Sequence, residues 1–412
     1  MRAPYPKRTE LDNLFSDCLN SAHKANRFIM AKTCVVFCIP NMVIGGVEFV
    51  LIRTLAELVK QPDLEISVIL SAPLTEPLFI EWFQAHPQIK TYVHMPLCHK
   101  FEALKDKCRV FPIKQIRKIA FSLYKKFRRA RFRRHELIRN ADVIIDYANF
   151  NYFKELKNVQ KYKLTFVHGS INYFNNSGFY ARTKYYDKIV VLSDSIKRDL
   201  AVQYPDIADK LVHIYNPINI DEIRTRAAQA SAPNGKYFTC VSRLNYDKDI
   251  PTLIKAFEAF WAQEQHPDVK LYIVGDGPAM GDFQTRASET TAREQIVFCG
   301  KQSNPFGYMR GAMAHILSSY NEGLPTVLIE AAVNDTLNIS SNCKSGPAEI
   351  LMNGDAGILF EPGDADALAQ IMSDVYHNRV NAKKMIKNAF LGLTRFSPEK
   401  ITMQIIDLIK AK

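Results

Sequence analysis

Short apolar runs alternate along most of the chain with segments whose apolar residues recur every three or four positions. In the first half, five runs rich in β-branched residues predict buried strands. They lie at 33–40, 64–73, 141–149, 162–170 and 186–193. Helical spacing is found at 49–60 and 194–205, where Asp194 is expected to cap the second helix. Strand, loop, helix and strand in this order form a βαβ unit, which predicts a parallel sheet.

The same alternation starts again after a polar Pro/Asn stretch near 217–224. Further strands are expected at 236–244, 269–278, 295–300 and 314–320, with helices at 249–263 and 325–333 between and after them. The chain is therefore expected to be α/β, with two doubly wound domains that place their loops at a shared cleft. We divide it into an N-terminal extension at 1–27, a first domain at 28–217, a second domain at 218–395, and a C-terminal helix at 396–412 that packs back on the first domain.

Composition narrows the class of protein. The chain has 412 residues, of which 47% are hydrophobic, and this is enough to fill two cores. Its eight cysteines stand mostly in apolar runs, as expected for buried thiols in a reducing compartment. No run approaches the roughly 20 apolar residues of a membrane span, and the run at 28–40 is interpreted as a first strand rather than a signal sequence. A cytoplasmic location is expected.

Positive charge is concentrated in one segment. The chain holds 54 basic and 42 acidic side chains, and residues 100–139 hold 15 of the basic and three of the acidic ones, so the rest is neutral. Apolar residues recur within this segment at helical spacing, which predicts a basic amphipathic helix. We favour docking on an anionic membrane surface. Nucleic acid is a rival partner, although no recognisable nucleic-acid fold surrounds the segment. A helix packed on the domain with a solvated charged face is the third interpretation.

The stretch from Tyr320 to Ala331, YNEGLPTVLIEA, places Glu322 and Glu330 on either side of a turn. Pro325 favours the first turn of a helix, so Glu322 is expected on the preceding loop and Glu330 within the helix. The helix N-terminus offers unpaired amides and a partial positive charge, which suit a phosphate. Ionised carboxylates beside it would accept hydrogen bonds from sugar hydroxyls. A surface loop acid and a helix-surface acid explain the same spacing equally well.

Other groups that suit a ligand also follow predicted strands. Arg243 and Lys248 together would neutralise a diphosphate, although two solvated loop cations would give the same pattern. His168 ends a strand, where a lone histidine is more often structural than catalytic. Glycines that allow close backbone approach stand in two strand-to-helix turns: Gly45, Gly46 and Gly275.

At this point the sequence resembles the GT-B-fold glycosyltransferases of family 4 (glycosyltransferase group 1), which are retaining and use nucleotide sugars. The resemblance is carried by GGVE at 45–48, HGS at 168–170, SRLNYDKD at 242–249, IVGDGP at 273–278, ILSSYNEGLPTVLIEA at 316–331 and CKSGPAEIL at 343–351. It implies two Rossmann-like domains that face a central cleft. The sequence departs from the family at Asn334 and Asp335, where a proline-containing turn is usual, and at Phe49, where an arginine is common.

The resemblance implies a donor site that is shared by both domains. Arg243 and Lys248 would hold the donor diphosphate, Glu330 would accept from the ribose hydroxyls, and Glu322 and His168 would contact the transferred sugar. The other implied donor-binding positions are amides that face the phosphates and loops near the base: Gly45, Gly46, Gly275, Lys301, Gly323, Leu324, Pro325 and Thr326.

The resemblance further implies metal-independent transfer from a UDP-sugar by front-face displacement, without a cofactor and without a carboxylate nucleophile. The acid pairs at 247–249 and 364–366 are interpreted as a phosphate loop and a helix cap rather than metal ligands. The acceptor would be a glycan or lipid-linked glycan of cell-surface polysaccharide or lipopolysaccharide synthesis, at the inner face of the cytoplasmic membrane. Two alternatives are a sugar-nucleotide epimerase of the same fold and a non-catalytic, membrane-associated sugar-nucleotide-binding subunit.

Overall fold

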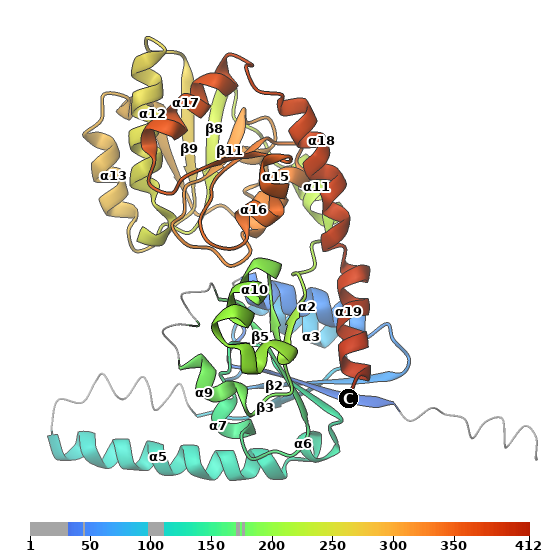
Figure 1. The fold of residues 1–412 in the computed structure, drawn as a ribbon. Helices are drawn as coiled ribbons and strands as arrows, with labels where there is room; N and C mark the ends of the chain where they lie inside the picture. The colour runs from blue at the N-terminus through green and yellow to red at the C-terminus, as the bar shows by residue number, and fades with distance from the viewer. Residues whose placement is uncertain (1–31, 44–45, 98–110, 170–173, 175–177) are drawn as a thin grey trace, which may run out of the picture.

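The computed structural model describes residues 32–43, 46–97, 111–169, 174 and 178–412, which form two α/β domains (Figure 1). The strands of the first domain are β1 (Thr33–Ile39), β2 (Leu64–Leu70), β3 (Lys90–Val93), β4 (Val143–Asp146), β5 (Tyr162–Val167), β6 (Lys188–Val191) and β7 (Leu211–His213). Its helices include α2 (Gly46–Leu58), α3 (Pro77–Ala85), α5 (Phe111–Arg134), α6 (Glu136–Asn140), α7 (Phe153–Leu156), α9 (Phe179–Thr183) and α10 (Asp194–Gln203).

The second domain repeats the alternation of strand and helix. Its strands are β8 (Lys236–Val241), β9 (Val269–Val274), β10 (Ile296–Gly300), β11 (Ala314–Leu317), β12 (Asn338–Ser341) and β13 (Ile358–Phe360). Its helices include α11 (Ile220–Gln229), α12 (Ile250–Gln263), α13 (Met280–Ser288), α14 (Phe306–Met309), α15 (Thr326–Val333), α16 (Pro347–Ile350), α17 (Ala365–Tyr376) and α18 (Ala382–Gly392). The chain then returns to the first domain as α19 (Pro398–Lys410).

Both sheets are parallel throughout, which confirms the α/β prediction. The strand orders are β3-β2-β1-β4-β5-β6-β7 and β10-β9-β8-β11-β12-β13. In each order the sequence reverses direction once, between β1 and β4 in the first sheet and between β8 and β11 in the second. Ligands of open parallel sheets bind beyond the carboxyl ends of the strands at such a reversal. The fold therefore directs attention to the loops that follow these four strands.

Among the strands that were not predicted, two do not follow the apolar pattern. The edge strand β3 (KTYV) is half exposed, and β12 (NISS) is polar although all its residues are buried. The polar groups of β12 find partners, since the Asn338 amide donates to the Leu328 carbonyl. The cap of α10 also differs from the prediction. Ser193 is the capping residue, because its hydroxyl accepts from the Ile196 amide, and Asp194 is the first helical residue.

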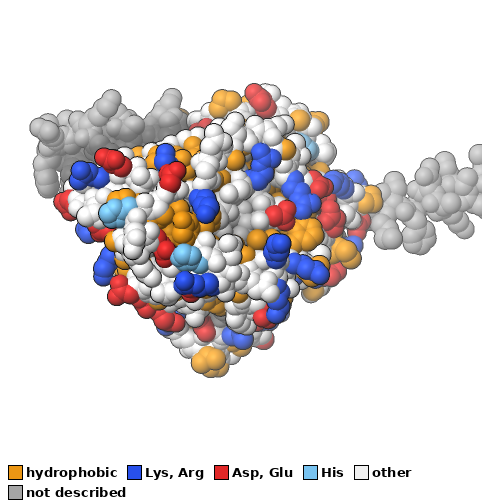
Figure 2. All heavy atoms as spheres, turned by 90° about the horizontal axis from the view of Figure 1, so that it is seen from above, with side chains coloured by type: hydrophobic (Ala, Val, Ile, Leu, Met, Phe, Trp, Pro, Cys, Tyr) orange, Lys and Arg blue, Asp and Glu red, His pale blue; other side chains and the backbone are white. Residues whose placement is uncertain are grey.

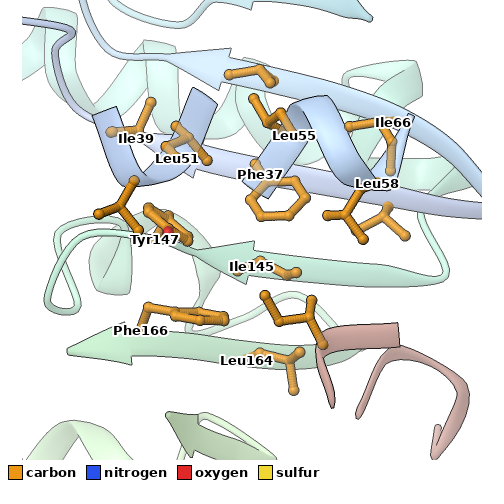
Figure 3. Close-up of a cluster of buried hydrophobic side chains, with 14 of the residues drawn as sticks. Phe37, Ile39, Leu51, Leu55, Leu58, Ile66, Ile145, Tyr147, Leu164 and Phe166 are labelled. Atoms are coloured by element: carbon orange, nitrogen blue, oxygen red, sulfur yellow. The ribbon is translucent and has the colours of Figure 1, made fainter. Parts of the chain in front are cut away.

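The core of the first domain fills the space between the sheet, α2 and α19. Phe37, Leu55 and Ile145 are fully buried in it (Figure 3). Near the carboxyl end of β5, the Tyr147 ring of this core packs against the imidazole of His168, with 5.0 Å between the ring centroids. The core therefore fixes the position of a residue at the end of β5.

The chain crosses between the domains twice, before α11 and before α19 (Figure 1). The crossings lie side by side, because the Ile218 amide donates to the Phe396 carbonyl at 2.9 Å. Beyond the second crossing, Ile401, Ile405 and Ile409 of α19 are buried in the core of the first domain. Within the described residues, no helix combines the length and the apolar character needed to span a membrane.

Candidate functional site

Residues of both domains line a cavity of ≈ 400 Å³ between them. Small-molecule sites typically occupy roughly 300–1,000 Å³. From the first domain, α2 and the end of β5 contribute Gly46, Arg53 and His168. From the second, α11 and the β11–α15 segment contribute Arg226, Glu322, Gly323, Leu324, Thr326 and Glu330. The structure thus brings seven of the predicted site residues into one cavity, and their roles in binding remain predictions.

Lys248 and Glu322 meet because β8 and β11 are neighbours at the strand reversal. The Lys248 ammonium donates to the Glu322 carboxylate at 2.8 Å, and the Ser319 hydroxyl donates to the same oxygen at 2.6 Å. The loop after β8 is held against β11, since the Ser318 hydroxyl donates to the Lys248 carbonyl at 2.9 Å. A carboxylate of the cavity lining is thereby fixed beside a cation that lies just outside the lining.

The turn that carries Glu322 rests on the loop before α16. The Ser345 hydroxyl donates to the Glu322 carbonyl at 2.7 Å. Gly346 has φ +86°, and a Cβ atom there would lie 2.5 Å from the Gly323 carbonyl oxygen and 2.6 Å from Pro325. Only glycine fits this close approach. Gly323 in turn faces the first domain, where a Cβ atom would lie 3.4 Å from the Gly169 carbonyl oxygen.

Helix α15 begins at Thr326, one residue after Pro325, which agrees with the predicted position of the helix. The first-turn amides of α15 have no partner within the helix, and this turn lies at the cavity because Thr326 lines it. Glu330 lies one turn further along the helix. Burial raises the pKa of Glu330, while the positive charges of Arg53 and Arg226 oppose that shift. The two glutamates of the motif therefore flank the helix N-terminus, one before it and one within the helix.

His168 is held as a neutral imidazole at the end of β5. Burial lowers its pKa from 6.5 to about 4, and the hydrogen bond to the Tyr147 carbonyl opposes this shift. Nε2 lies 2.9 Å from that carbonyl, which can only accept, so Nε2 carries the proton. Nδ1 then has a free lone pair and no protein partner in the described structure. An unpaired buried acceptor at a cavity wall suits a ligand hydroxyl.

Five predicted residues are not part of the cavity lining, and one of them is Lys248, which contacts the lining through its bond to Glu322. Arg243 is exposed on the loop after β8, and Lys301 is exposed after β10. Pro325 is buried and directly precedes α15. Gly275 has a structural reason of its own, because a Cβ atom at its φ of +140° would lie 1.8 Å from the Ser242 carbonyl oxygen. Gly45 lies outside the described residues.

The two arginines of the cavity lining, Arg53 and Arg226, were not predicted. Arg53 on α2 donates to both carboxylate oxygens of Glu222 on α11 at 3.2 Å, which joins the domains at the edge of the cavity. Arg226 lies over the Phe306 ring, 4.9 Å from its centroid. The sequence did hold one signal for Arg53, which follows Gly46 by seven residues. That spacing puts both on the same face of α2.

Both acid pairs of the sequence have structural roles. The Asp249 carboxylate accepts from the Thr252 amide and caps α12, and the Asp364 carboxylate accepts from the Ala367 amide at 2.9 Å and caps α17. Within the described ranges, no group of three or more His, Cys, Asp or Glu residues is arranged to hold a metal ion.

Comparison with known proteins gives this geometry a family. Residues 221–391 match the family described as Glycosyl transferases group 1. Lipopolysaccharide 1,6-galactosyltransferase of Salmonella typhimurium is 28% identical over 188 residues, which cover 44% of this chain and 50% of that protein. An N-acetylgalactosamine-N,N'-diacetylbacillosaminyl-diphospho-undecaprenol 4-alpha-N-acetylgalactosaminyltransferase of Campylobacter jejuni is 26% identical over 184 residues, which cover 45% of this chain and 49% of that protein.

The chain thus matches about half the length of these curated relatives. Among solved structures, Anabaena HepE in complex with UDP and glucose aligns with a TM-score of 0.67 at 17% identity, over 92% of this chain and 100% of that one. This likeness concerns the fold. Residues 221–391 match the glycosyl transferases group 1 family, and the two described domains have the GT-B fold.

Proposed function

We propose that this chain is a retaining, metal-independent glycosyltransferase that moves a sugar from a UDP-sugar to a glycan or lipid-linked glycan acceptor. The observation that carries the proposal is the cavity lined by Glu322, the N-terminus of α15 and Glu330, with Lys248 paired to Glu322. Similar proteins point the same way. A relative is named for a diphospho-undecaprenol-linked substrate, and a protein of the same fold binds UDP and glucose.

The donor would lie along the cavity with its charged centre at the start of α15. Helix N-termini bind phosphates through free amides and a partial positive charge. Lys248 and the exposed Arg243 would add the charge needed to neutralise a diphosphate. Glu330 would accept from the ribose hydroxyls. The free Nδ1 of His168 would accept from a hydroxyl of the transferred sugar.

The transfer would take place on one face of the sugar. The acceptor oxygen forms a bond to the anomeric carbon on the face from which UDP leaves. The bond between that carbon and the β-phosphate oxygen breaks with its electron pair on the diphosphate, which takes the acceptor proton. The protein contributes positioning and neutralisation of the leaving group. Glu322, held by Lys248 and Ser319, would orient the sugar through its hydroxyls.

A panel of nucleotide sugars tests this proposal. We expect at least one UDP-sugar to raise the melting temperature and to be slowly hydrolysed, with activity that survives EDTA. With an acceptor, the anomeric coupling constant of the product reports retention. Arg243→Ala is expected to abolish turnover, whereas Arg293→Ala, an exposed arginine of the same domain, is the control. Failure of every nucleotide sugar to bind would overturn the proposal, and recovery of an epimerised sugar nucleotide would favour the epimerase.

We further propose that the first domain docks on the inner face of the cytoplasmic membrane through α5, which has two apolar faces. One face packs on the domain through Phe132, whose ring lies 4.8 Å from the His94 ring. The other is an exposed stripe at helical spacing. The residues of the stripe are Ile116, Ile119, Leu123 and Phe127, which are 59–66% exposed. An apolar stripe flanked by Lys and Arg suits an anionic bilayer surface.

The position of α5 fits this role. It lies along the edge of the first domain that faces away from the second domain (Figure 1). By contrast, the surface at the end of the second domain mixes acidic and basic side chains (Figure 2). Positive charge is thus placed where a bilayer could approach without covering the cavity between the domains.

Flotation with phosphatidylglycerol-containing vesicles tests the docking. Ile119→Ser with Leu123→Ser is expected to weaken binding at least tenfold, because each full burial of such a side chain contributes about 1.5–3 kcal/mol. Val202→Ser removes an isolated, 82% exposed valine of the same domain and is the control. Binding should also weaken as salt rises. Binding to RNA but not to vesicles would contradict membrane docking.

A further inference from the structure

Beside the apolar stripe, α5 and α7 enclose a recess in which cations converge. It is lined by Lys126, Arg129, Arg133, Phe153, Lys154 and Lys157. The nearest acid is Glu155, whose carboxylate is nearly buried and accepts from Arg129 at 3.1 Å. This pair joins α5 to α7 and leaves the open side of the recess to the other four cations.

These other cations have no counter-charge in the described part of the chain. Lys126, Arg133, Lys154 and Lys157 make no ion pair there, although ion pairs are made elsewhere on the same domain. Like charges that converge in a recess repel one another and raise the potential within it, so the recess attracts anions. Arginine presents a planar fork that matches phosphate oxygens, and lysine adds a compact charge.

The recess opens beside the stripe, at the level where lipid phosphates would be found. Lys126 directly precedes Phe127 of the stripe, and Arg133 lies on the same flank two turns further along. An amphipathic helix inserts its apolar face about 5–10 Å into the boundary between headgroups and acyl chains, so its flanking cations reach the headgroups. Arg139 and Lys161 continue the basic strip in a neighbouring recess that also includes Arg133.

We infer that the recess between α5 and α7 binds the headgroup phosphate of an anionic phospholipid. The inference rests on the proposed membrane docking and adds a specific contact to it. Diffuse attraction alone would respond only to surface charge. A site for phosphate distinguishes lipids of equal charge by the chemistry of the headgroup.

Two sets of vesicles with the same zeta potential separate these cases. One takes its negative charge from phosphatidylglycerol and the other from oleate, in phosphatidylcholine. Wild-type protein is expected to partition about tenfold more strongly onto the phosphatidylglycerol vesicles, since a headgroup phosphate extends beyond the acyl boundary into the recess, whereas the oleate carboxylate lies at the end of its acyl chain. The triple variant Lys126→Gln/Lys154→Gln/Lys157→Gln should lower that ratio to about one. All three side chains are exposed or line an open recess, so the fold should survive, and circular dichroism checks this.

The control removes the same number of charges from α5, outside the recess. Lys118→Gln/Arg131→Gln/Arg134→Gln should weaken binding to both vesicles, about fivefold per cation, and keep the tenfold ratio. Equal partition of the wild type, or loss of the ratio in the control as well, would refute the phosphate site while leaving docking in place. Absence of binding to either vesicle would refute both. Transfer to a soluble acceptor, measured separately, decides the glycosyltransferase proposal independently.

Discussion

Substitution of Gly346 tests whether the loop before α16 holds the turn that carries Glu322 in place. In Gly346→Ala the new methyl group would lie 2.5 Å from the Gly323 carbonyl oxygen and 2.6 Å from Pro325, so the turn must move. Overpacking of this kind costs about 1–3 kcal/mol, and a side chain at φ +86° adds about 1–3 kcal/mol of strain. The expected loss in the free energy of unfolding is therefore about 2–6 kcal/mol.

Gly354→Ala is the matched control. This glycine has φ +103°, but a Cβ atom there meets nothing within 4 Å, so only the strain remains. The clash at Gly346, about 1–3 kcal/mol, should thus lower the melting temperature by about 2–12 °C more than the control, because 1 kcal/mol corresponds to about 2–4 °C in a domain of this size. Because Glu322 and the amides of the turn move with Gly323, kcat/KM should fall about a hundredfold, as for a misplacement of about 1 Å.

Differential scanning fluorimetry and initial rates of donor hydrolysis measure both effects. Equal melting temperatures for the two variants, together with kcat/KM within about twofold of wild type for Gly346→Ala, would refute the reasoning. A loss of stability without a loss of rate would show that the turn relaxes without moving the carboxylate.

Three further predictions concern protonation and capping. Since the pKa of His168 is lowered to about 4, the unfolded chain binds a proton between pH 6.5 and 4 that the folded chain does not. Stability should therefore fall by about 3 kcal/mol at most as the pH drops through this range. Urea titrations should show a flatter dependence on pH for His168→Gln, and an unchanged dependence would argue against a buried neutral imidazole. The positive charge of Arg53 lowers the pKa of Glu330, so in Arg53→Gln the loss of kcat/KM for the donor at low pH should begin at a higher pH. An unchanged pH dependence would show that ionisation of Glu330 does not control donor binding. Ser193→Ala should cost about 1 kcal/mol of stability and Asp194→Ala about half as much, an order that equal losses would contradict.

The sequence predicted the parts of the fold that depend on residues close together in the chain. Apolar runs marked the buried strands, and the ends of parallel strands predicted where ligand groups would gather. Strand β12 was not predicted because its side chains are polar. They are buried with hydrogen-bond partners from distant parts of the chain; the Ser341 hydroxyl, for example, donates to the Ser319 carbonyl at 2.6 Å. No periodicity in the sequence reveals such a partner.

The site divides in the same way. Lys248 and Glu322 are 74 residues apart, and their contact depends on β8 and β11 being neighbours, which local pattern does not show. Arg53 and Arg226 looked like ordinary surface cations of two helices. They enter the cavity only because the domains close on each other there. The family motifs lie at the ends of strands and the starts of helices, and neither arginine falls within one of them.

The paired crossings between the domains limit how the cavity can open. One flexible tether would leave a domain free to rotate about three axes, but two adjacent tethers joined by the Ile218–Phe396 hydrogen bond leave one easy axis. The burial of α19 in the first domain anchors the second tether firmly. We therefore expect opening to follow a single reproducible path, along which each side chain of the second domain returns to the same place opposite the first. Registry between the two sides of the cavity is in this way maintained by chain connectivity.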